Sequence, residues 1–364
     1  MTHMNPILPS EPPAAHAPRP PWSPLHARLH QLLLHNPALL PPSCPLLLAV
    51  SGGQDSMAMA RLLLDLQRLH HWRLHLWHGN HGWRPEAGEQ ARELQAWALE
   101  QGLPIHVAQA DPAMAQTEAA ARHWRYARLE ALALQIGCSH VLTGHTASDR
   151  SETLLLQLAR GSHAAGLSSL RRQRPLSAGS TITLVRPLLD LSRADTLAIC
   201  ERWGLPLWTD PSNANPRFSR NRVRAEVLPV LEALHPGASQ RISALSERLA
   251  AEQDASDDLT DLGLRALTPT NPGTADRLDR RALMALHPAN QRRLLHRWLE
   301  QHSGHTLAAR PLEALLLQLA PTRGPGFWAL PEGQTLHWDR HQLWLSHPSS
   351  KQGLQNHQPP QPAP

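Results

Sequence analysis

Lysine is almost absent from this sequence of 364 residues. Of its 35 lysine and arginine residues, one is lysine, Lys351, and all others are arginine. A Walker A loop, a protein kinase and a pyridoxal-phosphate enzyme each need a lysine at the site of chemistry. Lys351 lies in the C-terminal tail, so the sequence excludes these three classes. The arginine excess reflects either a biased genomic composition or phosphate recognition, because a guanidinium binds two phosphate oxygens at once.

Cysteine and long apolar runs are also scarce. Cys44, Cys138 and Cys200 lie far apart and form no Cys-x-x-Cys motif. This spacing argues against a disulfide framework or a thiolate metal site, and it favours a reducing compartment. No apolar stretch approaches the roughly 20 residues of a membrane helix, and residues 1–24 do not follow the pattern of a secretory signal. We therefore expect a cytoplasmic protein.

Short apolar runs alternate with helical periodicity between residues 46 and 190. The expected strands are 46–50, 73–77, 105–108, 140–143 and 181–185, and the expected helices are 55–69, 85–101, 116–136 and 147–159. Such alternation predicts an α/β, Rossmann-like domain with a parallel sheet and helices on both faces. Ligands of such domains bind at the carboxyl ends of the strands.

Composition divides the chain further. Residues 1–24 and 348–364 are rich in Pro, Gln and Ser, and we predict that they are disordered. An α/β domain is expected at 25–228, and a smaller, mainly helical domain with a terminal hairpin at 229–347.

Local periodicity changes within these two domains. It is lost between residues 193 and 224, where Asn, Pro and Arg accumulate, so irregular structure is expected there. Helices are expected again at 239–267 and 290–302, and two alternating runs within 327–346 predict the hairpin.

The segment SGGQDS at residues 51–56 separates the first expected strand from the first expected helix. Glycine lets a ligand approach the backbone, and a helix N-terminus offers unpaired N–H groups and a positive dipole end. Ser51, Gly52, Gly53 and Ser56 therefore supply donors for phosphate. A carboxylate beside phosphate, here Asp55, makes sense mainly through Mg²⁺. The alternative is an ordinary turn in which Asp55 caps the helix.

An acidic pair occurs in GHTASDRSET at residues 144–153. Asp149 and Glu152 are three residues apart, so on a helix both carboxylates face the same way. Two acids directed at one place repel each other unless a cation lies between them. The alternative is a solvated helix face with Arg150 as the partner.

Histidine and arginine provide further candidates. His78 and His81 have a spacing that suits zinc, but 24 histidines make such pairs common, so we favour hydrogen bonds from His81 and His145 near the nucleotide. The segment RFSRNRVR holds four arginines that suit RNA phosphates or form a solvated loop: Arg217, Arg220, Arg222 and Arg224. Trp208 and Phe218 are candidates for stacking a base.

SGGQDS after a strand resembles the loop of the ATP pyrophosphatases (PP-loop enzymes), which split ATP into AMP and pyrophosphate. Five later segments resemble the tRNA(Ile)-lysidine synthetase family within that superfamily. They are HGNHGWRPEAGEQA (78–91), EAAARHWRYARLEAL (118–132), TGHTASDRSETLLLQLARGSHAAGL (143–167), RPLLDLSR (186–193) and WTDPSNANPRFSRNRVRAEVLPVL (208–231). The resemblance is strong over roughly 45–235 and continues weakly beyond.

This resemblance implies a C–N ligase that adenylates cytidine 34 of the CAU-anticodon tRNA(Ile) and joins free L-lysine to it, giving lysidine, AMP and diphosphate. It implies that ATP binds at Ser51, Gly52, Gly53, Gln54, Asp55, Ser56, His81, Gly144 and His145, with Mg²⁺ at Asp55. The implied catalytic residues are Asp55, Arg125, Asp149 and Glu152. Lysine would bind Asp149 and Glu152, either of which would take its proton, and tRNA would bind the four arginines of 217–224. The resemblance also implies that the domain at 25–228 is catalytic and that the domain at 229–347 binds the substrate. Members of the family are often homodimers.

Two other interpretations remain open. One is a PP-loop tRNA thiolase, which would need sulfur-carrying or cluster-binding cysteines that this spacing does not favour. The other is a non-catalytic nucleotide- or RNA-binding protein of the same fold. Such a protein would keep the glycines, but it would not need both Asp55 and the Asp149–Glu152 pair.

Overall fold

The computed structural model describes residues 22–82, 86–111, 117–162, 164–168, 170–208, 216–269 and 276–346. The chain divides into two compact units, of which the first ends at Ala251 and the second begins at Glu252. Each unit is described by itself. Of the ends predicted to be disordered, only residues 22–24 belong to the described part of the chain.

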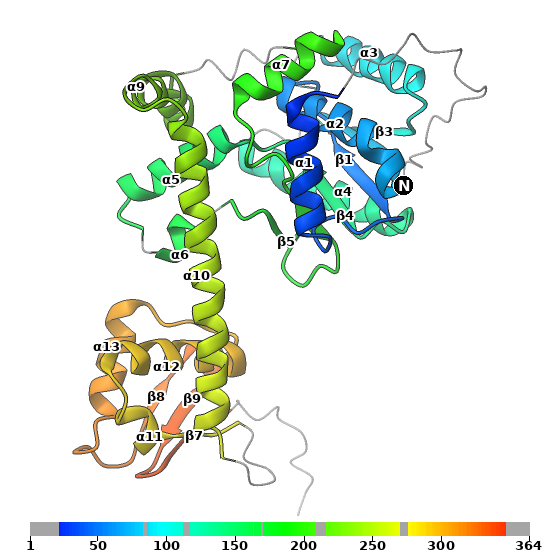
Figure 1. Cartoon of the computed structure of the whole chain (residues 1–364). Helices are drawn as coiled ribbons and strands as arrows, with labels where there is room; N and C mark the ends of the chain where they lie inside the picture. The colour runs from blue at the N-terminus through cyan, green and yellow to red at the C-terminus, as the bar shows by residue number, and fades with distance from the viewer. Residues whose placement is uncertain are drawn as a thin grey trace, which may run out of the picture. The chain divides into compact units, whose positions relative to one another are not determined.

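A six-stranded sheet forms the centre of the first unit (Figure 1). Its strands are β1 (Pro45–Ala49), β2 (Arg73–Asn80), β3 (Ile105–Gln109), β4 (His140–Thr143), β5 (Gln173–Pro175) and β6 (Thr183–Val185). Their order is β3-β2-β1-β4-β6-β5, and every neighbouring pair is parallel except β5 with β6. The predicted α/β class is confirmed, and each of the five expected strands is present.

Helices cover both faces of this sheet. Residues of α1, α2, α3 and α7 pack on one face and residues of α4 on the other. The helices of the unit are α1 (Pro24–His35), α2 (Gln54–His70), α3 (Ala87–Glu100), α4 (Glu118–Gln135), α5 (Ala147–Ala159), α6 (Ala164–Leu167), α7 (Arg193–Trp203), α8 (Ser219–Arg222), the π-helical turn η2 (Val223–Val227) and α9 (Leu228–Leu234). α10 (Ala238–Leu267) begins in the first unit and contains the boundary.

The alternation of side chains along β1 explains why two separate cores form. Leu46 and Leu48 point to one face and pack with residues of α1, α2 and α3. Leu47 points to the other face and packs with residues of α4, among them Leu129. Because successive residues of a strand face opposite sides, one strand of leucines serves both cores.

Two helices depart from the expectations. Irregular structure was expected from residue 193, but α7 occupies Arg193–Trp203, so that prediction was wrong there. α7 has a weak apolar periodicity, because few of its residues are buried. Ser192 nevertheless caps the start of α7, in a capping box that includes Asp195. α1 was not predicted, although Ser23 followed by Pro24 is a helix-start signal.

Two buried arginines anchor the first turns of α10. Arg150 of α5, which is 2% exposed, donates to Glu247 and to the carbonyl of Ser243. Arg172 donates to Glu247 at 3.4 Å and to Asp190 at 2.8 Å. Burial alone would raise the pKa of Glu247, but the two guanidinium groups hold it below its usual value. Arg150, which the alternative interpretation makes the partner of the Asp149–Glu152 pair on a solvated helix face, is thus buried and paired with Glu247.

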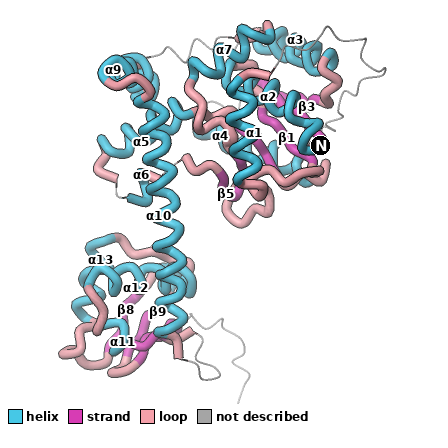
Figure 2. The backbone as a smooth tube through the Cα atoms, viewed as in Figure 1, coloured by secondary structure: helices cyan, strands magenta, loops and turns pink. Residues whose placement is uncertain are grey.

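The second unit packs helices on an antiparallel sheet (Figure 2). Its strands, in spatial order, are β7 (Leu278–Asp279), β10 (Gln342–Ser346), β9 (Thr335–Trp338) and β8 (Gly326–Ala329). Its other elements are α11 (Arg280–Met284), α12 (Pro288–Ser303), α13 (Ala309–Gln318) and the short η3 (Pro331–Gly333). The expected hairpin is part of this sheet, as β8–β9 and β9–β10. Among the described helices, none has the length and apolarity to cross a membrane.

We predict that Glu247→Gln lowers the free energy of unfolding by about 1–2 kcal/mol at pH 7, because it leaves two buried guanidinium groups without their shared counter-charge. The magnitude is modest since Glu247 is 42% exposed and water screens its charge. The folded-state pKa of Glu247 is depressed, so the difference from wild type should disappear as pH falls through it. Urea denaturation of both proteins across pH measures this.

Glu252→Gln is the matched control, because Glu252 is an exposed residue of the same helix. A Glu247→Gln protein as stable as this control at pH 7 would contradict the anchoring role.

Candidate active site

The glycine loop lies between β1 and α2, and its shape requires glycine. Gly52 has a φ of +83°, and a side chain there would overlap the indole ring of Trp208. A Cβ on Gly144, just beyond β4, would lie 2.8 Å from the backbone of Asp55. Strand β4 therefore ends directly against the start of α2, and the two chain segments approach more closely than any side chain allows.

Hydrogen bonds hold this loop in one conformation. The amide of Ser51 donates to Oγ of Ser56 at 3.1 Å, and that hydroxyl donates to the carbonyl of Gly53 at 2.9 Å. Gly53 is the N-cap of α2, and the side chain of Gln54 donates to the carbonyl of Arg193 at 2.8 Å. The first N–H groups of α2 thus lie at a preorganised helix start, the arrangement that binds phosphate.

Asp55 is held by two residues of α7. Oγ1 of Thr196 donates to Asp55 Oδ1 at 2.5 Å, and Nη1 of Arg193 lies 3.1 Å from Oδ2. Burial raises the pKa of Asp55, and Arg193 acts in the opposite direction. Sequence reasoning assigned no role to Arg193 or Thr196. The only signal in the sequence was that Arg193 is the last residue of the RPLLDLSR segment.

Asp149 and Glu152 are brought together, and both are buried. Their residues are 8% and 0% exposed, so they are not on a solvated helix face. Asp149 Oδ2 accepts from the amide of Thr146 at 2.8 Å and so caps the N-terminus of α5. α5 begins just after β4, so the Asp149–Glu152 pair lies beside the glycine loop. The negative charge of Asp149 contributes to raising the pKa of Asp55.

Two arginines of the RFSRNRVR segment bind this acidic pair. Arg220 donates to Glu152 at 2.7 Å and to Asp149 at 2.8 Å. Arg224 donates to the two carboxylate oxygens of Glu152 at 2.6 and 2.9 Å. Burial opposes ionisation of Asp149, but His145, Arg220, the Thr146 amide and Arg224 hold its pKa below the usual value. Asp149 is therefore ionised at neutral pH, and both carboxylates already face guanidinium groups.

The other arginines of this segment lie at the surface. Arg222 forms an exposed ion pair with Glu226 at 2.8 Å, and Arg217 is exposed. Phe218 is 46% exposed, whereas Trp208 covers the glycine loop and donates from Nε1 to Glu93 at 2.6 Å.

The histidines of the site are uncharged at neutral pH. Burial lowers the pKa of His145 to about 3, and Nδ1 of its ring lies 2.9 Å from the hydroxyl of Thr143. Burial and the nearby half-buried Arg125 lower the pKa of His81 to about 4. His78 bonds to the carbonyl of Val50 at 2.9 Å. Across the described ranges, no three His, Cys, Asp or Glu side chains form a group that could hold a metal, so nothing there supports the zinc interpretation.

Comparisons with known proteins identify the family of this chain. Residues 24–231 match the family model of the PP-loop domain, and residues 278–344 match that of the TilS substrate binding domain. The tRNA(Ile)-lysidine synthase of Parasynechococcus marenigrum (strain WH8102) is 51% identical, over 90% of this chain and 96% of the relative. The chain belongs to the tRNA(Ile)-lysidine synthase family. A synthase of Prochlorococcus marinus is 41% identical, over 89% of this chain and 97% of the relative.

Membership of the lysidine synthase family confirms the predicted family and enzyme class, an ATP-using C–N ligase. A solved structure, the U34-tRNA thiolase NcsA from Methanococcus maripaludis with its [4Fe-4S] cluster, has a TM-score of 0.52 at 18% identity. The match covers 62% of this chain and 77% of the thiolase chain, and it shows only that the two proteins share a fold. The thiolase interpretation is not favoured, because burial raises the pKa of both Cys138 and Cys200 to about 12 and keeps these thiols protonated.

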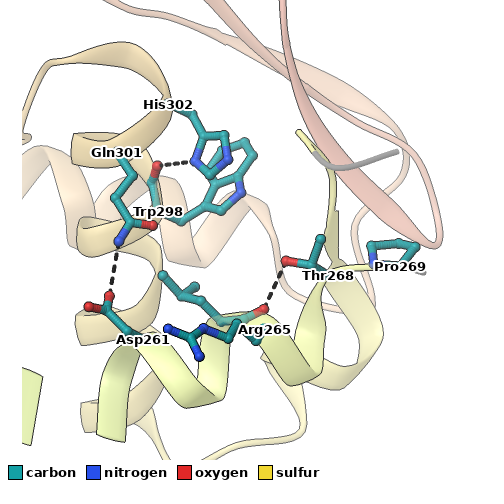
Figure 3. A pocket seen from close by; sticks show the side chains of 8 residues that line it. Asp261, Arg265, Thr268, Pro269, Trp298, Gln301 and His302 are labelled. Carbon is teal, nitrogen blue, oxygen red and sulfur yellow. Dashed lines mark hydrogen bonds between the residues drawn. The ribbon is translucent and has the colours of Figure 1, made fainter. Parts of the chain in front are cut away.

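A pocket of about 400 Å³ in the second unit does not have the chemistry of a lysidine synthase centre (Figure 3). Its one carboxylate, Asp261, is engaged by Arg297 at 3.0 Å and by Gln301 at 2.9 Å. His302 stacks on Trp298, with 5.0 Å between the ring centroids, and Trp298 is only 1% exposed. The groups that could react are therefore already paired or covered.

We predict that Thr196→Val slows ATP-dependent pyrophosphate release roughly 10- to 150-fold, the effect of losing a hydrogen bond of about 1.5–3 kcal/mol to a charged group. The variant keeps the shape of the side chain but releases Asp55 from its 2.5 Å contact. Thr260→Val is the control, because Thr260 is equally buried but bonds only to the carbonyl of Ser256 in its own helix. Equal rates for the two variants would contradict the positioning of Asp55.

Proposed function

We propose that the protein ligates free L-lysine to cytidine 34 of the tRNA(Ile) that carries a CAU anticodon. In the first step, O2 of the cytidine attacks the α-phosphate of ATP, and pyrophosphate leaves. In the second, the ε-amine of lysine attacks C2 and AMP leaves, giving lysidine. The observation that carries this proposal is the buried Asp149–Glu152 pair, bonded to two arginines and beside the glycine loop. The end of β4 would bind a cation, and the end of the neighbouring strand β1 would bind an anion.

The loop from Ser51 to Ser56 and the first N–H groups of α2 would bind the phosphates of ATP. His81 and His145 are neutral, so they would hydrogen-bond near the nucleotide without adding charge. Arg125 would stabilise the charge that develops on the transferred phosphoryl group.

Mg²⁺ fits this donor set. It binds in nucleotide sites through one or two carboxylates together with phosphate oxygens, and Asp55 lies close enough to Asp149 for their charges to interact. Asp55 would hold the ion, which when bound neutralises charge on the departing pyrophosphate.

Lysine would bind through its ammonium group at Asp149 and Glu152. These carboxylates are now bonded to Arg220 and Arg224, so the pocket is built to hold positive charge. An ammonium can take the place of one guanidinium without leaving a buried carboxylate uncompensated. The amine has an ordinary pKa of about 10.4 and arrives protonated, so Asp149 or Glu152 must take its proton before attack.

Arginines of the 217–224 segment would bind tRNA. Arg217 and Arg222 lie at the surface, where phosphate would compete with Glu226 for Arg222. Arg220 and Arg224 would reach tRNA only after they leave the acidic pair. We further propose, from the family resemblance alone, a cytoplasmic location and a homodimer, and a functional boundary between the catalytic and substrate-binding domains at residues 228–229.

The decisive experiment supplies unmodified tRNA(Ile) transcript and labelled ATP, with and without lysine. Adenylation and pyrophosphate release are expected with tRNA, and AMP release together with lysine incorporation only when lysine is added. Labelled lysine that never enters the tRNA would overturn the proposal. A non-catalytic binding protein would release no pyrophosphate at all.

We predict that Asp55→Asn abolishes pyrophosphate release and leaves the affinity for tRNA unchanged, because the carboxylate serves the nucleotide site. Filter binding of tRNA and a pyrophosphate assay on the same preparation measure both. Undiminished pyrophosphate release would refute the assignment of Asp55.

Glu152→Gln should raise the Michaelis constant for lysine roughly 10- to 150-fold, the loss of one charge-assisted hydrogen bond, and that for ATP far less. Steady-state kinetics with each substrate varied in turn measure both constants. Glu201→Gln, at an exposed position of α7, is the control. Equal rises for lysine and ATP would mean that Glu152 supports the whole site and does not bind lysine.

A further inference from the structure

Arg186 is a buried cation that the mechanism above does not use. It follows the last residue of β6, at the carboxyl edge of the sheet, and is 2% exposed. Its Nη1 donates to the carbonyl of Arg171 at 2.6 Å, and within the described residues its Nε has no hydrogen-bond partner. Burial lowers the pKa of Arg186 to about 10, so it is still charged at neutral pH. A buried, charged guanidinium with an unpartnered N–H is costly unless an anion joins it.

The groups around Arg186 add positive charge. Arg122 of α4 and Arg174 of β5 both lie over the ring of Tyr126, at 4.9 and 5.5 Å from its centroid. Among the neighbouring groups, Tyr126 acts on Arg186 most strongly and raises its pKa, whereas Arg174, Arg122 and Arg150 lower it, in that order. The charge of Arg150 is compensated by Glu247. Arg174 also donates from Nη1 to the carbonyls of Pro175 and Leu176, at 2.6 and 2.9 Å. Carbonyl contacts and cation–π contacts of about 0.5–2 kcal/mol each do not neutralise three neighbouring guanidinium groups, but an anion bound to them would.

The position of these arginines separates them from the glycine loop. Tyr126 packs on the core of the α4 face, whereas α2, which the glycine loop begins, belongs to the core of the opposite face. β6 is next to β4, and the charges of Arg186 and Arg122 reach His145 at the end of β4. The cluster therefore lies near His145, on the α4 face of the sheet, whereas ATP phosphates on α2 would lie on the opposite face.

We infer that Arg122, Arg174 and Arg186 form a second anion site that holds a backbone phosphodiester of the RNA substrate, next to the nucleotide being modified. Guanidinium groups bind phosphate oxygens two at a time, and Tyr126 gives the site a flat wall. The inference rests on the proposed function only in taking tRNA as the RNA.

The test measures binding of unmodified tRNA(Ile) transcript to the full-length protein over a series of salt concentrations. Arg122→Gln combined with Arg174→Gln avoids the buried Arg186 and should leave the fold intact. Each phosphate contact to a single-stranded segment contributes about 0.7 to the slope of log K against log salt, so losing two should flatten the slope by about 1.4. Arg128→Gln, an exposed arginine on the same helix, should leave the slope as in wild type.

The Michaelis constant for ATP, measured in the same proteins, distinguishes the two sources of phosphate. A flatter salt slope with an unchanged ATP constant supports the RNA site. A raised ATP constant with an unchanged slope would show that the arginines serve the nucleotide and would overturn the inference. A double variant that behaves like Arg128→Gln in both assays would overturn it too. Because tRNA binding is measured without lysine, the outcome does not depend on whether lysidine forms.

Discussion

Compensation of buried charge at the carboxyl ends of β4 and β6 governs the arrangement of the first unit. Asp149 and Glu152 lie in a place that solvent hardly reaches, and an uncompensated carboxylate there would cost several kcal/mol. Arg220 and Arg224 supply the compensating charge, and in doing so they fix α8 and η2 against α5. The same ion pairs thus position a chain segment and compensate the charge of the acidic pair.

This arrangement ties substrate binding to the position of the arginine segment. An ammonium that enters the acidic pair competes with a guanidinium, and the released guanidinium then needs another anion. The phosphates of RNA are the anions that the proposed reaction brings. At the end of β6, Arg186 and its neighbours carry an excess of positive charge. At the start of α2, Asp55 is held by Arg193 and Thr196. Acidic and basic groups therefore alternate along one edge of the sheet.

Close backbone packing is the second constraint on this edge. Gly144 touches the backbone of Asp55, and Gly52 lies under the ring of Trp208, so the glycine loop is enclosed by β4 on one side and by an aromatic side chain on another. A parallel sheet brings these segments together because its strands all end at the same edge. The two neutral histidines complete the edge without altering its charge balance.

The sequence by itself determined the α/β class, because apolar runs and helical spacing alternate strongly enough from β1 to α5 to define the elements. It also determined the glycine loop, the acidic pair and the family, since these depend on residues close together in the chain. The sequence did not predict α1 and α7, because their apolar patterns are weak or short. Capping and packing on α2 stabilise these two helices.

Tertiary structure alone decided which charges meet. Asp55 and Thr196, or Glu152 and Arg224, are far apart in the chain, and only the crossover order of the strands brings them into contact. The burial of Arg150 and Arg186 could not be read from the sequence either, because arginine is usually exposed. The division of the chain into two compact units falls within α10. The functional boundary at residues 228–229 stays a prediction. Local pattern fixes which elements form, but the partners of a charged side chain depend on what the whole fold places within reach of it.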